Sequence, residues 1–253
     1  MRVAIVDFET TGTDRVNDRP WGWAVATCDE DFKIIKVSDG QMWANDYPDI
    51  PAVVQELCGI SEVRLDAPHP EHVLPRIIEE IKDCDYVLAY NYLFDKTIFE
   101  SECERQEITP PESNWLCAME HVQWERKYRC KQLAHLAFDH GIVETNAHDA
   151  KADVVLTAKL LANRGETCEK MSAYRDEPYV YIRADFPKPF GRTEKEGKFL
   201  QALAKADGYN WESCRNTDEP KFPKMWVKRV KESQFEAETA EKRQFKRFKV
   251  EAE

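Results

Sequence analysis

Short apolar runs separated by polar connections open the chain and predict β-strands. Each run is long enough to form a buried strand, and the connections between the runs are short. We therefore expect three early strands joined as a meander. They are Arg2–Phe8, Gly22–Thr27 and Phe32–Val37.

Apolar positions at helical spacing then alternate with further short runs. Val73, Ile77, Ile78 and Ile81 share one side of a helix predicted over His72–Asp83. Strands followed by alternating helices and strands are typical of an α/β domain in which helices cover a sheet. The other predicted elements are helices at Ile50–Gly59, Phe94–Arg105, Gln132–His140 and Ala150–Ala162, a buried strand at Tyr86–Tyr90 and an extended segment at Asn114–Glu120.

A second pattern begins after Asp176–Pro178, which we predict as a domain boundary. Residues 1–178 would form the main α/β domain, and residues 179–253 a small α+β accessory unit. The charged segment Val230–Glu253 predicts a solvated helix or a frayed tail. The other predicted elements of this unit are strands at Tyr179–Phe186, Tyr209–Trp211 and Met225–Val230, and a helix at Glu194–Ala206.

Charge is distributed unevenly between the two predicted domains. The net charge of −11 argues against a protein that coats nucleic acid without selectivity. Residues 1–178 hold 19 Lys and Arg against 34 Asp and Glu, whereas residues 179–253 hold 17 against 13. An acidic body with a basic second unit suggests two separate tasks.

The sequence predicts a cytoplasmic protein without a membrane segment. It has no run of about 18 apolar residues, and Met1–Asp7 becomes acidic too early for a signal peptide. None of the eight cysteines forms a Cys-x-x-Cys pair, so we expect reduced thiols. A zinc site could be sought among Cys117, His121, Cys130 and His135, but the paired short spacings of a zinc motif are missing.

Two carboxylates, Asp7 and Glu9, stand at the end of the first predicted strand. Residues i and i+2 of a strand point to the same face, so the two side chains lie next to each other. Such a pair is unfavourable at the end of a buried strand unless a cation neutralises it. Mg²⁺ and Mn²⁺ prefer these oxygen ligands. The alternative is an acidic pair on a solvated strand edge.

A third carboxylate, Asp95, follows the predicted strand Tyr86–Tyr90 in the segment Asn91-Tyr92-Leu93-Phe94-Asp95. The start of a helix stabilises negative charge through the helix dipole. On its own, this segment therefore favours an ordinary first-turn or capping aspartate.

The segment His148-Asp149-Ala150-Lys151-Ala152-Asp153 leads into the last predicted helix of the main domain. His148 would lie in the loop, and Asp153 in the first turns beside the apolar ridge of the helix. On its own, this segment favours a capping Asp149 and a surface Asp153.

Together and in this order, the three segments resemble the motifs of the DEDD (DnaQ-like) exonuclease superfamily, in its histidine-containing branch. Those motifs are Asp-x-Glu-x-Thr-Gly, Asn-x-x-Phe-Asp and His-x-Ala-x-x-Asp. The resemblance covers about residues 1–170 and includes Leu57–Ser61, Trp115–Met119 and Gln132–Ala134. The sequence is similar to enzymes of the exonuclease X, ribonuclease T and proofreading-subunit type, and this resemblance implies an RNase H-like mixed sheet flanked by helices. Tyr90 replaces a common His, which we expect to affect only the grip on the 3′ end.

The resemblance implies a 3′→5′ exonuclease that releases nucleoside 5′-monophosphates. Two Mg²⁺ or Mn²⁺ ions would be held by Asp7, Glu9, Asp95 and Asp153, and His148 would deprotonate the attacking water. Ordinary packing or turn chemistry is an equal alternative for each residue expected to contact the terminal nucleotide. These residues are Thr10, Thr11, Asn91, Tyr92 and Phe94.

Aromatic and basic residues interleave in the accessory unit. Lysine or arginine for phosphates and aromatic rings for bases are the two components of single-strand binding. The alternative is that the rings form the core of a very small domain, which needs large apolar groups. The aromatic residues are Tyr209, Trp211, Phe222 and Trp226, and the basic ones are Arg215, Lys221, Lys224, Lys228 and Arg229.

DNA, preferably single-stranded, is the expected substrate, and a replication or repair protein is a candidate partner. An RNA-trimming or polymerase-proofreading exonuclease remains an alternative, because phosphate and metal contacts are the same for both sugars. An inactive exonuclease fold used as a nucleic-acid-binding module is the alternative from another class. Loss of a carboxylate would favour it, and here all four are present.

Overall fold

The computed structural model divides the chain into two compact units, Met1–Arg175 and Asp176–Glu253. The division falls three residues before the predicted boundary. The residues that the structure describes are 1–57, 66–125, 130–143, 149–185, 202–206, 208–212, 225–240 and 246–250.

A mixed five-stranded sheet forms the centre of the first unit, as the predicted fold class requires. The strand order is β3-β2-β1-β4-β5. The meander β1–β2–β3 is antiparallel, whereas β4 runs parallel to both β1 and β5. The strands are β1 Val3–Thr10, β2 Pro20–Cys28, β3 Ile34–Gln41, β4 Tyr86–Ala89 and β5 Trp115–Cys117.

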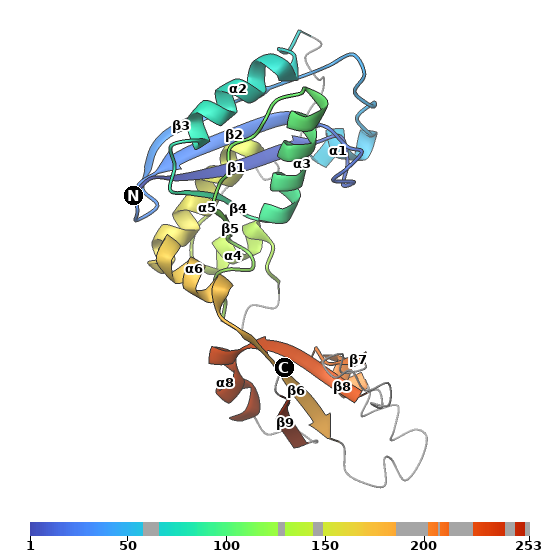
Figure 1. Ribbon diagram of the computed structural model, residues 1–253, viewed down its shortest axis with the longest axis vertical. Coiled ribbons are helices and arrows are strands. Elements are labelled where there is room, and N and C mark those ends of the chain that lie inside the picture. The colour runs from blue at the N-terminus through green and yellow to red at the C-terminus, as the bar shows by residue number, and fades with distance from the viewer. Residues whose placement is uncertain are drawn as a thin grey trace. The chain divides into compact units, whose positions relative to one another are not determined.

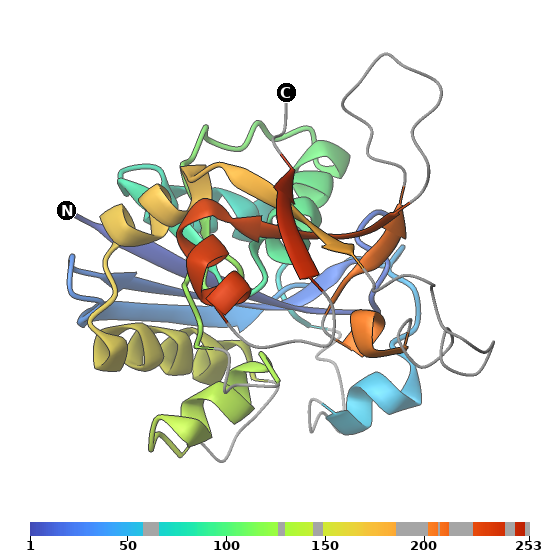
Figure 2. The same cartoon turned by 90° about the horizontal axis from the view of Figure 1, so that it is seen from below.

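Helices cover both faces of this sheet (Figure 1). In Figure 2, β1 and β2 lie between α3 on one side and α5 on the other. Every residue of β2 is buried, which agrees with a strand covered on both faces. The helices are α1 Ala52–Leu57, α2 Pro70–Ile81, α3 Tyr92–Arg105, α4 Leu133–Asp139, α5 Ala150–Arg164 and α6 Cys168–Asp176.

Alternation along β1 divides its side chains between two cores. Val3 and Ile5 pack in the core that includes residues of α5, whereas Ala4, Val6 and Phe8 pack in the core that includes residues of α2 and α3. The position of every later side chain on β1 follows from this alternation. It decides on which face the acidic residues of the strand lie.

Local sequence signals set the ends of the longest helix, α5. The side chain of Asp149 is the N-cap and accepts a hydrogen bond from the N–H of Ala152 at 2.9 Å. Gly165 ends the helix in the left-handed region with a φ of 61°, where glycine meets no steric penalty. The cap thereby fixes where the first turn of α5 starts.

A four-stranded antiparallel sheet of order β7-β8-β6-β9 forms the second unit. Its core contains Val180, Ile182, Trp226 and Val230 together with Tyr209, whose side chain is 1% exposed. Tyr209 and Trp226 therefore serve as core residues, which is the alternative that sequence left open. The strands are β6 Tyr179–Asp185, β7 Asn210–Glu212, β8 Met225–Lys231 and β9 Lys246–Val250.

The last part of the chain differs from the prediction of a solvated helix or frayed tail. After a short 3₁₀ turn at Glu232–Gln234, the chain forms helix α8 at Phe235–Ala240 and then strand β9, which pairs with β6. Most of the predicted helix Glu194–Ala206 lies outside the described residues, and 202–206 are helical. In the described part of the chain, no helix is long and apolar enough to span a bilayer.

Candidate active site

Asp7 and Glu9 lie near the end of β1, on the face that Val3 and Ile5 share with α5. Both side chains are half-buried, while Phe8 between them is buried against the opposite core. The strand thus presents two neighbouring carboxylates at one edge of the domain, as its alternation predicts.

Asp95 lies in the first turn of α3, and its side chain is only 4% exposed. Its Oδ1 accepts a hydrogen bond from the backbone N–H of Phe8 at 3.1 Å. The N-cap position of the helix belongs to Asn91 instead. Asp95 is therefore tied to the strand between Asp7 and Glu9, a contact that an ordinary surface first-turn aspartate does not make.

Asp153 lies in the first turn of α5 and is half-buried. Asp149 caps the helix, as the sequence suggested for that residue. Helix α5 packs against β1 and β2. Asp153 lies near Asp7, because its charge contributes to raising the pKa of Asp7. His148 lies outside the described residues.

The electrostatics show that these carboxylates form one cluster. Burial raises the pKa of Asp7 well above its usual range, and the nearby charges of Asp95, Asp153, Glu9 and Asp149 raise it further. The four predicted carboxylates thus gather from β1, α3 and α5. Asp149 also reaches this cluster, although sequence reasoning gave it only a capping role. Its signal was its spacing of four residues from Asp153, which puts both on one side of a helix.

Asp95 is the second strongly perturbed member of the cluster. Burial raises its pKa to about 7, with further upward contributions from Glu9 and Asp153, while the hydrogen bond from Phe8 acts in the opposite direction. Carboxylates that are buried beside other carboxylates favour protonation or a bound cation. The donor set, which consists of oxygens only, suits Mg²⁺ or Mn²⁺.

The carboxylates do not yet enclose a common point. Among the described residues, no three His, Cys, Asp or Glu side chains are arranged as a ready-made metal shell. Their mutual charge effects nevertheless place Asp7 within reach of Asp95, Asp153 and Glu9. The residue types, which are all carboxylates, fit a divalent cation.

The zinc site considered from the sequence is also not assembled in the described residues. His121 accepts a hydrogen bond from the N–H of Cys117 at its Nδ1, 2.9 Å away, and Cys130 contacts Nδ1 of His135 at 3.1 Å. These are two separate pairs, and in the described ranges they do not join into a group of three metal-binding side chains.

The loop after β1 holds Thr10 and Thr11 in defined positions. The N–H of Thr11 donates to the carbonyl of Arg19 at 3.0 Å, and its hydroxyl donates to Asp18 at 2.9 Å. The hydroxyl of Thr10 donates to the carbonyl of Gly12 at 2.5 Å. Both threonines are buried, so their polar groups serve the conformation of the loop.

The other residues expected to contact a nucleotide lie at the start of α3. Asn91 is exposed, and Tyr92 is half-buried with its ring 5.4 Å from that of His121. Phe94 is half-buried and packs against the core on the α3 side of the sheet. Leu93, which sequence analysis passed over, is 49% exposed between them.

A buried ion pair that sequence analysis did not predict joins this loop to α3. Arg19 donates to both carboxylate oxygens of Glu102, and the Nη2–Oε1 distance is 2.8 Å. Glu102 is fully buried and also accepts from Arg105 at 3.2 Å. Arg105 in turn donates to the carbonyl of Val16 in the loop. The loop is therefore fixed to the helix that carries Asp95.

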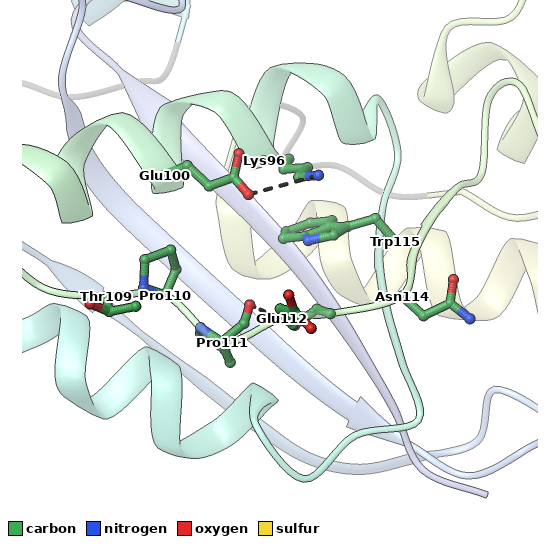
Figure 3. Close-up of a pocket in the computed structure, with 9 residues that line it drawn as sticks. Lys96, Glu100, Thr109, Pro110, Pro111, Glu112, Asn114 and Trp115 are labelled. Atoms are coloured by element: carbon green, nitrogen blue, oxygen red, sulfur yellow. Dashed lines mark hydrogen bonds and ion pairs between the residues drawn. The ribbon is translucent and has the colours of Figure 1, made fainter.

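A pocket of about 650 Å³ lies elsewhere on α3, between Lys96, Glu100 and the Thr109–Trp115 segment. Figure 3 shows the ring of Trp115 between the two α3 side chains and the Pro110–Pro111 segment. Lys96 and Glu100 form an ion pair of 3.7 Å. None of the predicted site residues lines this pocket.

A mixed sheet covered by helices, with acidic residues of β1, α3 and α5 gathered at one end, suits a metal-dependent hydrolase. The chain belongs to the RNase T family of exonucleases, whose family model matches residues 4–161. This confirms the predicted membership of the DEDD superfamily and implies the use of a divalent metal.

A curated relative supports the same family. The 3′-5′ exonuclease DinG of Staphylococcus aureus (strain USA300) is 31% identical over 173 residues. The matched region is 66% of this chain but only 18% of DinG, so the chain spans less than a fifth of that relative.

Solved exonuclease structures share the fold. The zinc-bound complex of E. coli exonuclease I with single-stranded DNA has a TM-score of 0.61 at 18% identity, covering 91% of this chain and 63% of that one. A 3′-exonuclease that recognises the histone mRNA stem-loop has a TM-score of 0.56 at 14% identity, covering 64% and 80%. At these identities the likeness concerns the fold.

Proposed function

We propose that this protein is a 3′→5′ exonuclease that removes nucleotides from single-stranded DNA with the help of two divalent cations. The observation that carries the proposal is the acidic cluster of β1, α3 and α5. Asp95 accepts a hydrogen bond from the N–H of Phe8, between Asp7 and Glu9, and burial together with the charges of Asp95, Asp153 and Glu9 raises the pKa of Asp7. A nearby positive charge would stabilise the ionised form of these carboxylates. The exonuclease family and the DinG relative support the reaction class.

In this proposal, Asp7, Glu9, Asp95 and Asp153 hold Mg²⁺ or Mn²⁺. When bound, the cations would activate a water and neutralise the charge that develops on the phosphorane-like transition state. His148 accepts the proton of that water. The oxygen of the water forms a bond to phosphorus while the bond from phosphorus to the 3′ oxygen of the preceding nucleotide breaks. That 3′ oxygen then takes up a proton from solvent. The products are a nucleoside 5′-monophosphate and a strand with a new 3′-hydroxyl.

The loop after β1 and the start of α3 are the proposed walls for the terminal nucleotide, and the buried Thr10 and Thr11 hold the conformation of that loop. Asn91, Tyr92 and Phe94 contribute an amide, a phenol and a ring close to Asp95 in sequence. The ion pair between Arg19 and Glu102 keeps the loop at α3, which supports a preformed site.

We favour single-stranded DNA as the substrate because exonuclease I is bound to it in a structure of the same fold. RNA remains the main alternative, since another neighbour recognises an mRNA stem-loop. A polymerase-proofreading role also stays open. An inactive binding module is disfavoured because all four carboxylates and His148 are present.

Digestion of end-labelled substrates with Mg²⁺ tests the proposal directly. We expect linear single-stranded DNA to shorten from its 3′ end and to release mononucleotides. Duplex DNA and RNA of the same sequence should react more slowly. A terminal 3′-phosphate should block the reaction, because the site is proposed to accept a free 3′ end.

Circular single-stranded DNA is the control for this assay. Equal cutting of circular and linear strands would show an endonuclease. Faster digestion of RNA than of DNA would identify RNA as the preferred substrate. Binding without cleavage at any Mg²⁺ or Mn²⁺ concentration would favour the inactive module.

We further propose that the second unit tethers long substrates. Residues 179–253 carry a net charge of +4, whereas the rest of the chain carries −15. The guanidinium of Arg229, which is exposed, lies 3.6 Å from the ring centroid of the partly exposed Tyr179. Exposed cationic and aromatic groups at one place suit phosphates and bases. Tyr209 and Trp226, being buried, are not candidates for this contact.

Deleting residues 179–253 is expected to raise KM for long single strands and to leave kcat nearly unchanged. The effect should be largest at low salt, because phosphate contacts weaken as salt increases. Strands of a few nucleotides should show little change. The measurement is steady-state kinetics at two chain lengths and two salt concentrations.

Two substitutions separate tethering from folding. Arg229→Gln should reproduce part of the KM effect in a stable protein. Trp226→Ala should destabilise the second unit by about 3–5 kcal/mol, as is usual for a buried Trp. An unchanged KM for the truncated protein at low salt would mean that this unit serves another purpose, such as docking a protein partner.

A further inference from the structure

Gly22 on β2 lies directly opposite Glu9 on β1 in the antiparallel pairing. A methyl group built on Gly22 would lie 3.0 Å from Cβ of Glu9 and 3.3 Å from its Cγ. Opposed Cβ atoms in antiparallel strands are normally about 4.5–5.5 Å apart. The two strands approach so closely at this pair that a side chain at position 22 would require a shift of a few tenths of an ångström.

An irregularity in the ladder stands beside this close approach. Glu9 pairs with Gly22, but the next residue, Thr10, pairs with Pro20, so Trp21 is an extra residue on β2. Such bulges bend a strand and redirect the side chains next to them. Here the bulge adjoins a carboxylate of the acidic cluster.

The lack of room for a side chain, and not the backbone conformation, explains why position 22 is a glycine. Among the described glycines, only Gly141, Gly165 and Gly208 have a positive φ. The backbone at position 22 is thus open to any L-residue, and the contact with Glu9 is what a side chain would disturb. Glycine within a strand commonly marks this kind of close approach.

We propose that Gly22 is a positioning residue that sets the direction of the Glu9 carboxylate toward the divalent cations. This inference rests on the proposed function, in which Glu9 is a cation ligand. The small shift required by a side chain at position 22 would either separate the two strands or displace Glu9. Both displacements move one ligand oxygen relative to Asp7, which keeps its own partner, Ala24, on β2.

Gly40 offers a matched control in the same sheet. It lies on β3 opposite Trp23, and a methyl group there would come within 3.2 Å of the indole Nε1. Gly40→Ala therefore creates a similar steric conflict, but its neighbour is a core ring instead of a cluster carboxylate. Any general effect of crowding the sheet should appear in both variants.

The test measures Mn²⁺ binding to the full-length protein by calorimetry, without substrate. We expect Gly22→Ala to weaken Mn²⁺ binding by about 10- to 100-fold, the usual effect of losing a residue that orients a metal ligand. Gly40→Ala should bind Mn²⁺ like the wild type. Thermal unfolding in chelator should shift to a similar extent in both variants. High Mn²⁺ should restore most of the kcat of Gly22→Ala.

A double-mutant cycle with Glu9→Ala completes the test. If Gly22 acts through Glu9, adding Gly22→Ala to Glu9→Ala should cause no further loss of Mn²⁺ affinity. Wild-type affinity in Gly22→Ala, or an equal loss in Gly40→Ala, would overturn the inference while the proposed function stands. Failure of the wild-type protein to bind Mn²⁺ or Mg²⁺ at all would instead overturn the proposed function.

Discussion

Asp7→Asn is expected to abolish hydrolysis while leaving the fold intact. Burial and the charges of Asp95, Asp153 and Glu9 all raise the pKa of Asp7. Cations held there are expected to contribute several kcal/mol to the transition state, so their loss corresponds to a decrease of about 10³-fold or more. The measurement is the single-turnover rate on 3′-labelled single-stranded DNA, with Asp153→Asn as a parallel variant. A near-normal rate in either variant would contradict the assignment of that residue as a cation ligand of the active site.

The stability of the same variant, measured in chelator, provides an independent check. The raised pKa values of Asp7 and Asp95, the latter about 7, mean that the folded state binds more protons than the unfolded state, whose Asp groups titrate near pH 3.9. Stability should therefore decrease as pH rises from about 4 through about 7. Asp7→Asn removes one of the repelling charges, so its stability above pH 7 should equal or exceed that of the wild type. Urea unfolding at pH 5 and pH 8 measures both effects.

His148→Ala is expected to lower kcat by about 10²–10⁴-fold, the usual contribution of a general base. Mn²⁺ affinity should stay close to that of the wild type, because the proposed ligands are the four carboxylates. The two readouts are kcat at saturating substrate and calorimetric Mn²⁺ binding. Asp153→Asn is the contrasting variant, in which both should fall. Loss of Mn²⁺ affinity in His148→Ala would make His148 a ligand.

Much of the fold was predictable because its strands and helices have clear periodicity. β1, β2 and β3 were predicted from apolar runs, and α5 from its ridge of apolar residues after a capping aspartate. The motifs also placed the four carboxylates on the right elements. The resemblance then implied a common role for these carboxylates as cation ligands, which stays a prediction and which no single segment indicated.

The missed features depend on contacts between distant segments. α6 has only two buried residues, Cys168 and Met171, so its sequence has a weak helical pattern. β9 has the sequence Lys-Arg-Phe-Lys-Val, whose basic residues do not give the apolar alternation that predicts a strand. It lies at the edge of its sheet, where charged residues are common. The bond from Phe8 to Asp95 and the close approach of Gly22 to Glu9 likewise follow only from the pairing of elements far apart in sequence.

The anchoring of the loop after β1 has an entropic consequence for substrate binding. Surface loops usually lose conformational freedom when they close on a ligand, and ordering each side chain costs about 0.5–1.5 kcal/mol of affinity. In this protein, Thr11 is already bonded to Asp18 and to Arg19, and Arg19 is held by Glu102 beneath the surface. Folding has therefore ordered this loop before any nucleotide arrives. A terminal nucleotide that contacts it would keep most of its interaction energy as affinity.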